Sequence, residues 1–352
     1  MRHTRKVTVG NVTIGGGAPV SIQSMTNTRT SDARATLEQI NALKEAGCDI
    51  VRLAVCNDDD LAACRTIVRQ TDVPLVADIQ FDWKLAAACS DIGFKKVRFN
   101  PGNIGSDENV RQLTNVCKHN GTPIRVGVNL GSLQKDVAEK YGRTATALCE
   151  SALRHVALLE KYGFYDTVVS VKASDIRICT EAYRMLSEKC DYPLHLGITE
   201  SGGSFRGIVK SSVGIGSLLL AGIGDTVRVS LTGDPVLEVL TAKQLLLALG
   251  LRQGCEIVSC PTCSRCNIDL AAIYNAVAEL AENVAVPLKI AVMGCVVNGP
   301  GEALDADLGV AGGNNGKSVL FSRGKVLKTV ANEQIVPALK KLIEEHLQTY
   351  DR

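Results

Sequence analysis

The sequence is poor in aromatic residues and carries almost no net charge. Of its 352 residues only 4% are Phe, Trp or Tyr, and 39 basic residues against 37 acidic ones leave a formal net charge of +2. Such a balance creates no extended electrostatic field, and scarce aromatic rings offer no stacking surface for bases. We therefore expect no nucleic-acid partner, and any anion binding must be local.

Long apolar runs are missing as well. The two longest, 213–223 and 245–251, are interrupted by glycine or too short to cross a bilayer. The basic N-terminal segment is followed by no apolar core, so it has the pattern of neither a signal peptide nor a transit peptide. The cysteines number 13, an odd count that does not fit a secreted disulfide framework. These features predict no membrane span and a cytoplasmic protein with reduced thiols.

What the chain does contain is an alternation of short β-branched runs with longer helical stretches. Strands are expected at 19–23, 50–54, 75–79, 96–99, 124–128, 167–171, 194–198 and 226–229, each followed by a helix candidate. Eight such pairs within about 230 residues are typical of a (β/α)8 barrel. An open doubly wound sheet would normally carry a GxGxxG turn after its first strand, and none is present there. The sequence therefore predicts an α/β fold with an N-terminal TIM barrel.

The alternation stops near residue 250, where a cysteine-rich segment begins. We expect a substrate-binding TIM-barrel domain over 1–254 and a small α+β domain over 255–352 that binds an iron-sulfur cluster. Within the second domain we expect a helix at 269–283, strands near 288–292 and 308–311, a later hairpin, and a final helix at 332–348. The triplet Gly15-Gly16-Gly17 is expected to form the turn of an N-terminal hairpin made by residues 7–9 and 11–14.

Cationic residues recur in or beside the expected barrel strands. They are Arg52, Arg98, Arg125, Lys172 and Arg228. In a TIM barrel the carboxyl ends of the strands form the active site, and a ring of cations there suits a phosphate ester or a diphosphate. Neutral or acidic groups lie at the same ends, among them Asp78, Gln80, Asn129, His195, Thr199, Glu200 and Ser230. The alternative is that some cations point outward and pair with acids, since a slip of one residue reverses the facing of a strand.

The densest motif is Cys260-Pro-Thr-Cys263-Ser-Arg-Cys266, followed by Gly294-Cys295 and then by Glu302. Three assemblies are compatible with it. Structural zinc would use Cys260, Cys263, Cys295 and a fourth Cys or a His. A ferredoxin-type cluster would use four cysteines. A catalytic cluster would use three cysteines and leave one iron to an exchangeable oxygen ligand, for which Glu302 is the candidate. Spacing alone leaves these open, and with them a non-enzymatic electron carrier or a zinc-stabilised binding module.

Several segments resemble one known family. They are SIQSMTNT, VRFNPGNIG, IRVGVNLGSL, HLGITESGG, VKSSVGIGSLLLAGIGDTVRVSLT, SCPTCSRC, GCVVNGPGEA and GKSVLFSRGK. Together they resemble the 4-hydroxy-3-methylbut-2-enyl diphosphate synthases of the methylerythritol phosphate route to isoprenoids, and the match covers essentially the whole chain. One departure is Gln80, which stands where the family has histidine.

The resemblance implies an activity and a cofactor. It implies a 4Fe-4S cluster held by Cys260, Cys263 and Cys295, with Glu302 on the fourth iron until substrate displaces it. The implied reaction is the two-electron reductive ring opening and dehydration of 2-C-methyl-D-erythritol 2,4-cyclodiphosphate to (E)-4-hydroxy-3-methylbut-2-enyl diphosphate. Reduced flavodoxin or ferredoxin would supply the electrons.

The resemblance also implies a binding mode. The diphosphate would lie in the barrel mouth, on Arg52, Arg98, Arg125, Asn129, Lys172, Thr199, Glu200, Arg228 and Ser230. The family forms a head-to-tail homodimer, so the active site would be shared between subunits. We add the hypothesis that Glu200 delivers a proton to the departing hydroxyl.

Overall fold

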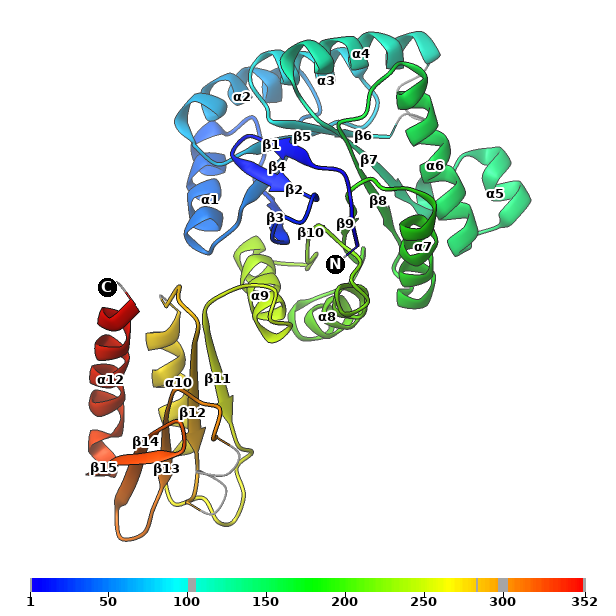
Figure 1. Cartoon of the computed structure of the whole chain (residues 1–352). Coiled ribbons are helices and arrows are strands. Elements are labelled where there is room, and N and C mark those ends of the chain that lie inside the picture. Colours follow the sequence, from blue (N-terminus) through cyan, green and yellow to red (C-terminus); the bar gives the residue numbers. More distant parts are fainter. Residues whose placement is uncertain (1, 101–105, 283, 297–302, 351–352) are drawn as a thin grey trace. The chain divides into compact units, whose positions relative to one another are not determined.

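The structure is a computed structural model, and it describes residues 2–100, 106–282, 284–296 and 303–350. Residue contacts divide the chain into two compact units, Met1–Leu249 and Gly250–Arg352 (Figure 1). Among the described residues, no helix is both long enough and apolar enough to cross a membrane.

Unit 1 is built on an eight-stranded parallel sheet. Its strands are β3 (Ser21–Met25), β4 (Ile50–Ala54), β5 (Leu75–Asp78), β6 (Lys96–Phe99), β7 (Ile124–Asn129), β8 (Thr167–Lys172), β9 (His195–Leu196) and β10 (Thr226–Val227). Each strand pairs with the next along the chain, and β10 returns to pair with β3. The β8 and β9 edges meet through a single parallel bridge, Val169 to Leu194. The expected (β/α)8 barrel is confirmed, with β3 starting at Ser21 rather than at residue 19.

Helices surround this sheet (Figure 1). They are α1 (Ala33–Glu45), α2 (Asp58–Gln70), α3 (Trp83–Asp91), α4 (Asp107–Asn120), α6 (Ala145–Lys161), α7 (Ile176–Lys189), α8 (Ser204–Leu220) and α9 (Pro235–Ala248). Most begin at a side-chain cap, as where Asp32 accepts from the amide of Ala35 and where Asp175 accepts from the amide of Ile178. The short helices η2 (Leu130–Ser132) and α5 (Lys135–Tyr141) were not expected.

An N-terminal hairpin lies against one end of the barrel interior. Strands β1 (Val7–Val9) and β2 (Val12–Ile14) pair antiparallel, and their inward side chains pack on Ile50, Val76 and Val168. The turn is Gly10-Asn11, where Gly10 has a φ of 61°, so the prediction that the glycine triplet forms the turn was wrong. The triplet follows β2 instead. A Cβ on Gly15 would stand 2.3 Å from the carbonyl oxygen of Arg5, which explains glycine there.

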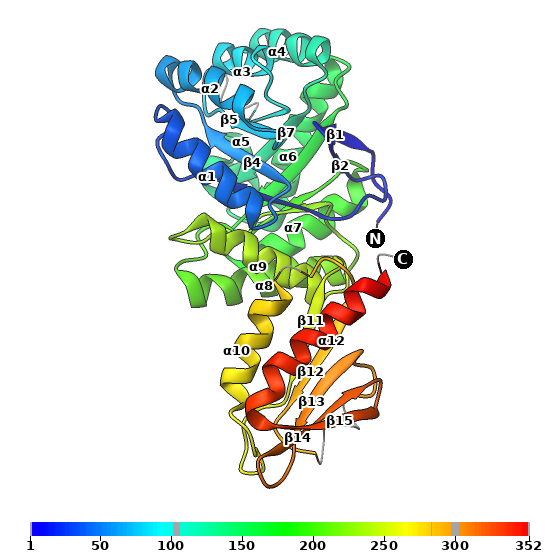
Figure 2. The same cartoon turned by 90° about the vertical axis from the view of Figure 1, so that its left-hand side faces the viewer.

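Unit 2 is a five-stranded mixed sheet, in the order β11 (Cys255–Ser259), β12 (Leu288–Met293), β13 (Leu308–Gly312), β14 (Lys317–Ser322) and β15 (Lys325–Ala331). The first three strands run parallel and the last two form an antiparallel hairpin. Helices α10 (Leu270–Ala281) and α12 (Ile335–Tyr350), the latter preceded by η3 (Asn332–Gln334), contact each other and cover one face (Figure 2). Strand β11 was not predicted, because its five residues are mixed in polarity and do not alternate between buried and exposed positions.

Candidate active site and cysteine edge

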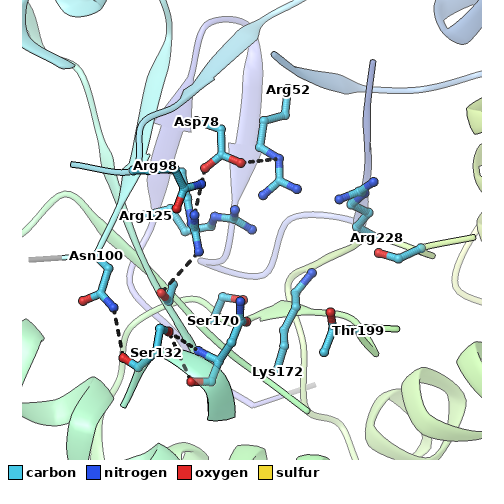
Figure 3. Close-up of a pocket in the computed structure, with 14 residues that line it drawn as sticks. Arg52, Asp78, Arg98, Asn100, Arg125, Ser132, Ser170, Lys172, Thr199 and Arg228 are labelled. Atoms are coloured by element: carbon cyan, nitrogen blue, oxygen red, sulfur yellow. Dashed lines mark hydrogen bonds and ion pairs between the residues drawn. The ribbon is translucent and has the colours of Figure 1, made fainter. Parts of the chain in front are cut away.

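A pocket of about 250 Å³ opens at the carboxyl ends of the barrel strands (Figure 3). Its lining is polar and comes from strands β4 to β8 and from the residues around β9 and β10. The lining residues are Arg52, Asp78, Gln80, Arg98, Asn100, Arg125, Gly127, Asn129, Ser132, Ser170, Lys172, Thr199, Arg228 and Ser230. All five cations named from the sequence therefore face one space. Asn129, Thr199 and Ser230 face it as well.

Two of the cations share one carboxylate. Asp78 lies between Arg98, whose Nη1 is 2.9 Å from Oδ1, and Arg52, whose Nε is 3.7 Å from Oδ2 (Figure 3). Burial opposes ionisation of Asp78, but the attraction of Arg52, Arg98 and Arg125 prevails and lowers its pKa below the ordinary value. Burial, partly offset by Asp78, lowers the pKa of Arg52 to about 10. Asp78 thus fixes the orientation of two guanidinium groups.

Arg228 is held by a carboxylate that the sequence analysis missed. Glu238, in the first turn of α9, is buried and accepts from Nε of Arg228 at 3.3 Å. The same carboxylate accepts from the hydroxyl of Ser24 at 3.0 Å and from the amide of Leu231 at 2.9 Å. Glu238 and the buried Ala242 are spaced by about one helical turn in α9, so both lie on the same face of the helix. This spacing is the feature of the sequence that could have indicated that the carboxylate points inward.

The other two cations, Arg125 and Lys172, form no ion pair with a carboxylate among the described residues. The side chain of Arg125 is buried, and its Nε and Nη1 have no hydrogen-bond partner among the described residues. Burial, followed by repulsion from Arg52 and Arg98, holds the pKa of Arg125 well below its ordinary value. Burial, followed by repulsion from Arg125 and Arg228, does the same for Lys172. Figure 3 shows the charged ends of Arg125 and Lys172 directed into the same space. An anion there would meet two uncompensated donors.

Glu200 lies beside this pocket rather than in it. It lines a smaller neighbouring cavity of about 190 Å³ that shares Asn129, Lys172 and Thr199 with the main one. Its side chain is exposed, and its φ of 54° places the backbone in the left-handed region. Non-glycine residues adopt that conformation at an energetic cost and are enriched at functional sites.

Asp78→Asn is expected to destabilise the fold by about 3–5 kcal/mol, because it leaves two buried guanidinium groups without their shared carboxylate. Since folding lowers the pKa of Asp78, its contribution is complete above its unfolded pKa and is lost as the pH falls through the folded value. Urea unfolding at pH 7 and near pH 3 should show that acid lowers the free energy of unfolding less for the variant than for wild-type protein. Asp72→Asn, which removes an exposed ion pair to Lys44, is the matched control and should change little. Equal effects of the two substitutions would contradict this account.

The cysteines of unit 2 gather at the carboxyl edge of its parallel strands. Cys260 directly follows β11, and Cys295 follows β12 after Gly294, while Ser259 and Val292 are register partners. The amide of Gly294 donates to Sγ of Cys260 at 3.2 Å. Cys263 is exposed and Cys295 is buried. Within the described ranges, no three Cys, His, Asp or Glu side chains converge on a point where one metal ion would bind.

This donor set fits a cluster better than a single ion. A cubane distributes its ligands over separate iron corners, so its cysteines need not meet at one point, and backbone amides donating to the sulfur are typical of such sites. Cys266 differs from the other three, because its thiol donates to the carbonyl of Ile268 at 3.2 Å. The proposed fourth ligand, Glu302, lies outside the described residues.

Fold and site together define a TIM-barrel protein with a cationic pocket and a second unit whose sheet edge carries cysteines. Two family models match the chain, the GcpE TIM-barrel domain over residues 4–243 and the GcpE protein C-terminal domain over residues 256–345. The chain belongs to the GcpE family.

Relatives match along almost the full length. The 4-hydroxy-3-methylbut-2-en-1-yl diphosphate synthase (flavodoxin) of Ruminiclostridium cellulolyticum is 51% identical over 345 residues, which are 97% of this chain and 98% of the relative. The protein of the same name from Parafrankia sp. is 53% identical over 350 residues, 99% of this chain and 90% of the relative. Among solved structures, dihydropteroate synthase from Stenotrophomonas maltophilia superposes with a TM-score of 0.52 over 70% of this chain and 98% of its own. At 12% identity that likeness shows the barrel fold alone.

Proposed function

We propose that this chain reduces 2-C-methyl-D-erythritol 2,4-cyclodiphosphate to (E)-4-hydroxy-3-methylbut-2-enyl diphosphate, a step of the methylerythritol phosphate pathway. Reduced flavodoxin or ferredoxin supplies the electrons. Two electrons and two protons enter, the two C–O bonds at neighbouring carbons break, a C=C bond forms and one water leaves. The observation that carries the proposal is a cationic pocket at a barrel mouth in a chain half-identical to synthases of that name.

The pocket residues divide into two roles. Arg52, Arg98 and Arg228 are held in place by Asp78 and Glu238, so they orient the diphosphate without reorganising. Within the part of the chain that the structure describes, Arg125 and Lys172 have no carboxylate partner, so they gain most from the anion and neutralise the phosphate that departs from the tertiary carbon. Asn129, Thr199 and Ser230 supply further hydrogen bonds from the pocket wall.

Cys260, Cys263 and Cys295 would hold a 4Fe-4S cluster, with Glu302 as its exchangeable fourth ligand. When bound, that cluster supplies electrons and a Lewis-acidic iron for the hydroxyl that leaves. The amide of Gly294 stabilises negative charge on the Cys260 sulfur. Glu200, at the edge of the pocket beside Lys172, would give a proton to the departing hydroxyl. An electron carrier or a zinc-stabilised module would have no use for the cationic pocket.

The direct test is turnover under anaerobic conditions. Protein reconstituted with iron and sulfide, the cyclic diphosphate and reduced flavodoxin should yield the allylic diphosphate by mass spectrometry, and the preparation should show the absorbance of a cluster. A colourless, zinc-containing preparation that binds no cyclic diphosphate would refute the proposal.

We also propose a homodimer in which the cysteine-bearing unit of one copy serves the barrel of the other. An apolar stripe on α8 supports a second copy, since Phe205, Val209, Val213 and Leu220 are exposed at helical spacing. A stripe of this kind is typical of an interface between chains.

Subunit mixing tests the dimer. Arg125→Met damages the barrel site and Cys295→Ser the cysteine site, so a re-equilibrated equal mixture should recover about a quarter of wild-type activity, the share of intact sites under random pairing. The control mixture, Arg125→Met with Lys172→Met, carries both defects in the barrel and should recover nothing. No recovery in the first mixture would exclude a site shared between subunits.

A further inference from the structure

A second layer of polar side chains lies inside the barrel, one step below the pocket. It consists of Ser21 and Gln23 on β3, Lys96 on β6, His195 on β9 and Thr226 on β10, which we call the inner belt. All five are buried. Arg98 lies two residues after Lys96, and Arg228 lies two residues after Thr226. Both arginines line the pocket. Because strand side chains alternate, the belt residues face the interior as well.

The strand register brings the belt residues together. Thr226 is the register partner of His195 on one side and of Ser21 on the other, so three neighbouring strands present polar groups at one level. Barrel interiors are usually filled by layers of branched apolar side chains. A polar layer in this position is therefore a specific feature rather than ordinary core packing.

The belt groups lack protein partners. Nζ of Lys96, both ring nitrogens of His195, both amide atoms of Gln23 and the hydroxyls of Ser21 and Thr226 make no hydrogen bond within the described residues. Buried polar atoms in folded proteins are nearly always paired, so a layer of unpaired groups beneath the pocket is unusual. The amine of Lys96 and the imidazole of His195 are groups that can accept a proton.

The charged surroundings of the belt are almost wholly cationic. The pocket above the belt is lined by Arg52 on β4, Asp78 on β5, Arg98 on β6, Arg125 on β7, Lys172 on β8 and Arg228 just after β10, while the buried Tyr183 on α7 donates its hydroxyl to the carbonyl of His195. Asp78 is already shared by Arg52 and Arg98, and Arg228 is paired with Glu238 outside the belt. No carboxylate among the described residues is left to compensate Lys96 or His195.

Burial, followed by repulsion from Arg125 and Arg52, holds the pKa of Lys96 well below its ordinary value. Burial, followed by repulsion from Arg125, Lys172 and Lys96, does the same for His195. Burial and the cationic surroundings therefore disfavour protonation of both side chains while the pocket is empty. The cost of charging them falls when an anion neutralises the cations above.

We propose that Lys96 and His195 form a proton-accepting layer of the diphosphate site, so that the anion enters the pocket together with a proton bound by the inner belt. This inference rests on the proposed function, because it takes the cyclic diphosphate as the occupant of the pocket. The proton stored there compensates the anion without a fixed positive charge that would destabilise the empty barrel. The pKa of the belt is then higher in the complex than in the free protein. Between these two pKa values, thermodynamic linkage requires the diphosphate to bind more tightly as the pH falls.

Calorimetric titration of the oxidised, cluster-loaded protein with the cyclic diphosphate tests this, because without reductant no turnover occurs. Repeating the titration in buffers of different ionisation enthalpy gives the number of protons taken up on binding. We expect wild-type protein to take up about one proton per site at pH 7.5, and Lys96→Met to take up about half as much or less. The dissociation constant of Lys96→Met should also vary less with pH between 6.5 and 8.5.

Lys95→Met is the matched control, since Lys95 is the exposed neighbour of Lys96 and should leave proton uptake unchanged. His195→Gln tests the belt independently if Lys96→Met fails to fold. Undiminished proton uptake in both folded belt variants, or no uptake by wild-type protein, would overturn the inference while leaving the proposed function intact. Failure of wild-type protein to bind the cyclic diphosphate at all would instead refute the proposed function.

Discussion

Replacing Arg125 by methionine is expected to lower kcat/KM by about 10²- to 10³-fold while raising the free energy of unfolding by about 1–4 kcal/mol. The two effects have one cause. Arg125 is buried in a pocket where no described residue hydrogen-bonds to its Nε or Nη1, so its charge costs stability until an anion arrives. Methionine fills similar space without charge. Steady-state kinetics under anaerobic conditions and urea unfolding of the same preparation measure both quantities.

The informative control is Arg98→Met in the same pocket. Arg98 is 2.9 Å from Asp78, so its loss should impair activity and also lower stability by about 3–5 kcal/mol. If Arg125→Met raises the free energy of unfolding while Arg98→Met lowers it, the two cations differ in whether a described carboxylate compensates their charge. If both variants lost stability equally, the division between them would be wrong. Arg34→Met, on the exposed face of α1, should alter neither quantity.

Substitution of any one of Cys260, Cys263 and Cys295 by serine is expected to abolish both the cluster absorbance and turnover. Each substitution removes a thiolate from the set proposed to hold the cluster. Removing a residue that only hydrogen-bonds to a ligand lowers metal affinity or activity by roughly 10- to 100-fold, and losing a ligand itself should cost more. Cys266→Ser is the matched control within the same segment, since serine can still donate to the carbonyl of Ile268. Iron and acid-labile sulfide analysis, with spectra and turnover, measures the outcome.

A fourth variant separates the possible ligand sets. Glu302→Ala should retain a cluster but turn over slowly, because the exchangeable oxygen ligand is lost while the thiolates remain. Loss of the cluster in Cys266→Ser would instead indicate four-cysteine ligation, and with it a closed electron-transfer site. Retention of full absorbance and activity in Cys295→Ser would remove Cys295 from the ligand set.

Much of the barrel could be predicted from local pattern. The strands Ile50–Ala54 and Lys96–Phe99 have the bounds expected of them. Because parallel strands end at one edge, Arg125 and Lys172 could be assigned to a common site although 47 residues separate them in the sequence. Local pattern failed where tertiary contacts decide. Strand β11 is formed by pairing with β12, and its own residues alternate too weakly to indicate it.

The candidate site was predictable in its members but not in its internal pairing. Nothing in the sequence around Glu238 marks it as the partner of Arg228, since an acidic residue in a first helical turn is ordinarily solvated and favours the helix dipole. Lys96 and His195 were likewise not recognisable as an unpartnered layer, because partnership depends on every strand of the barrel.

The sequence by itself determined the eight βα units, the strand ends at which the cations stand and the cysteine-rich segment that opens the second unit. These follow from periodicities of two and 3.6 residues, which act over a few neighbours. Only the tertiary structure decided which cations are compensated, since Asp78 pairs with Arg52 and Arg98 while no described carboxylate pairs with Arg125. Charge compensation depends on burial and on distances that closure of the barrel creates, and neither is encoded in any local pattern.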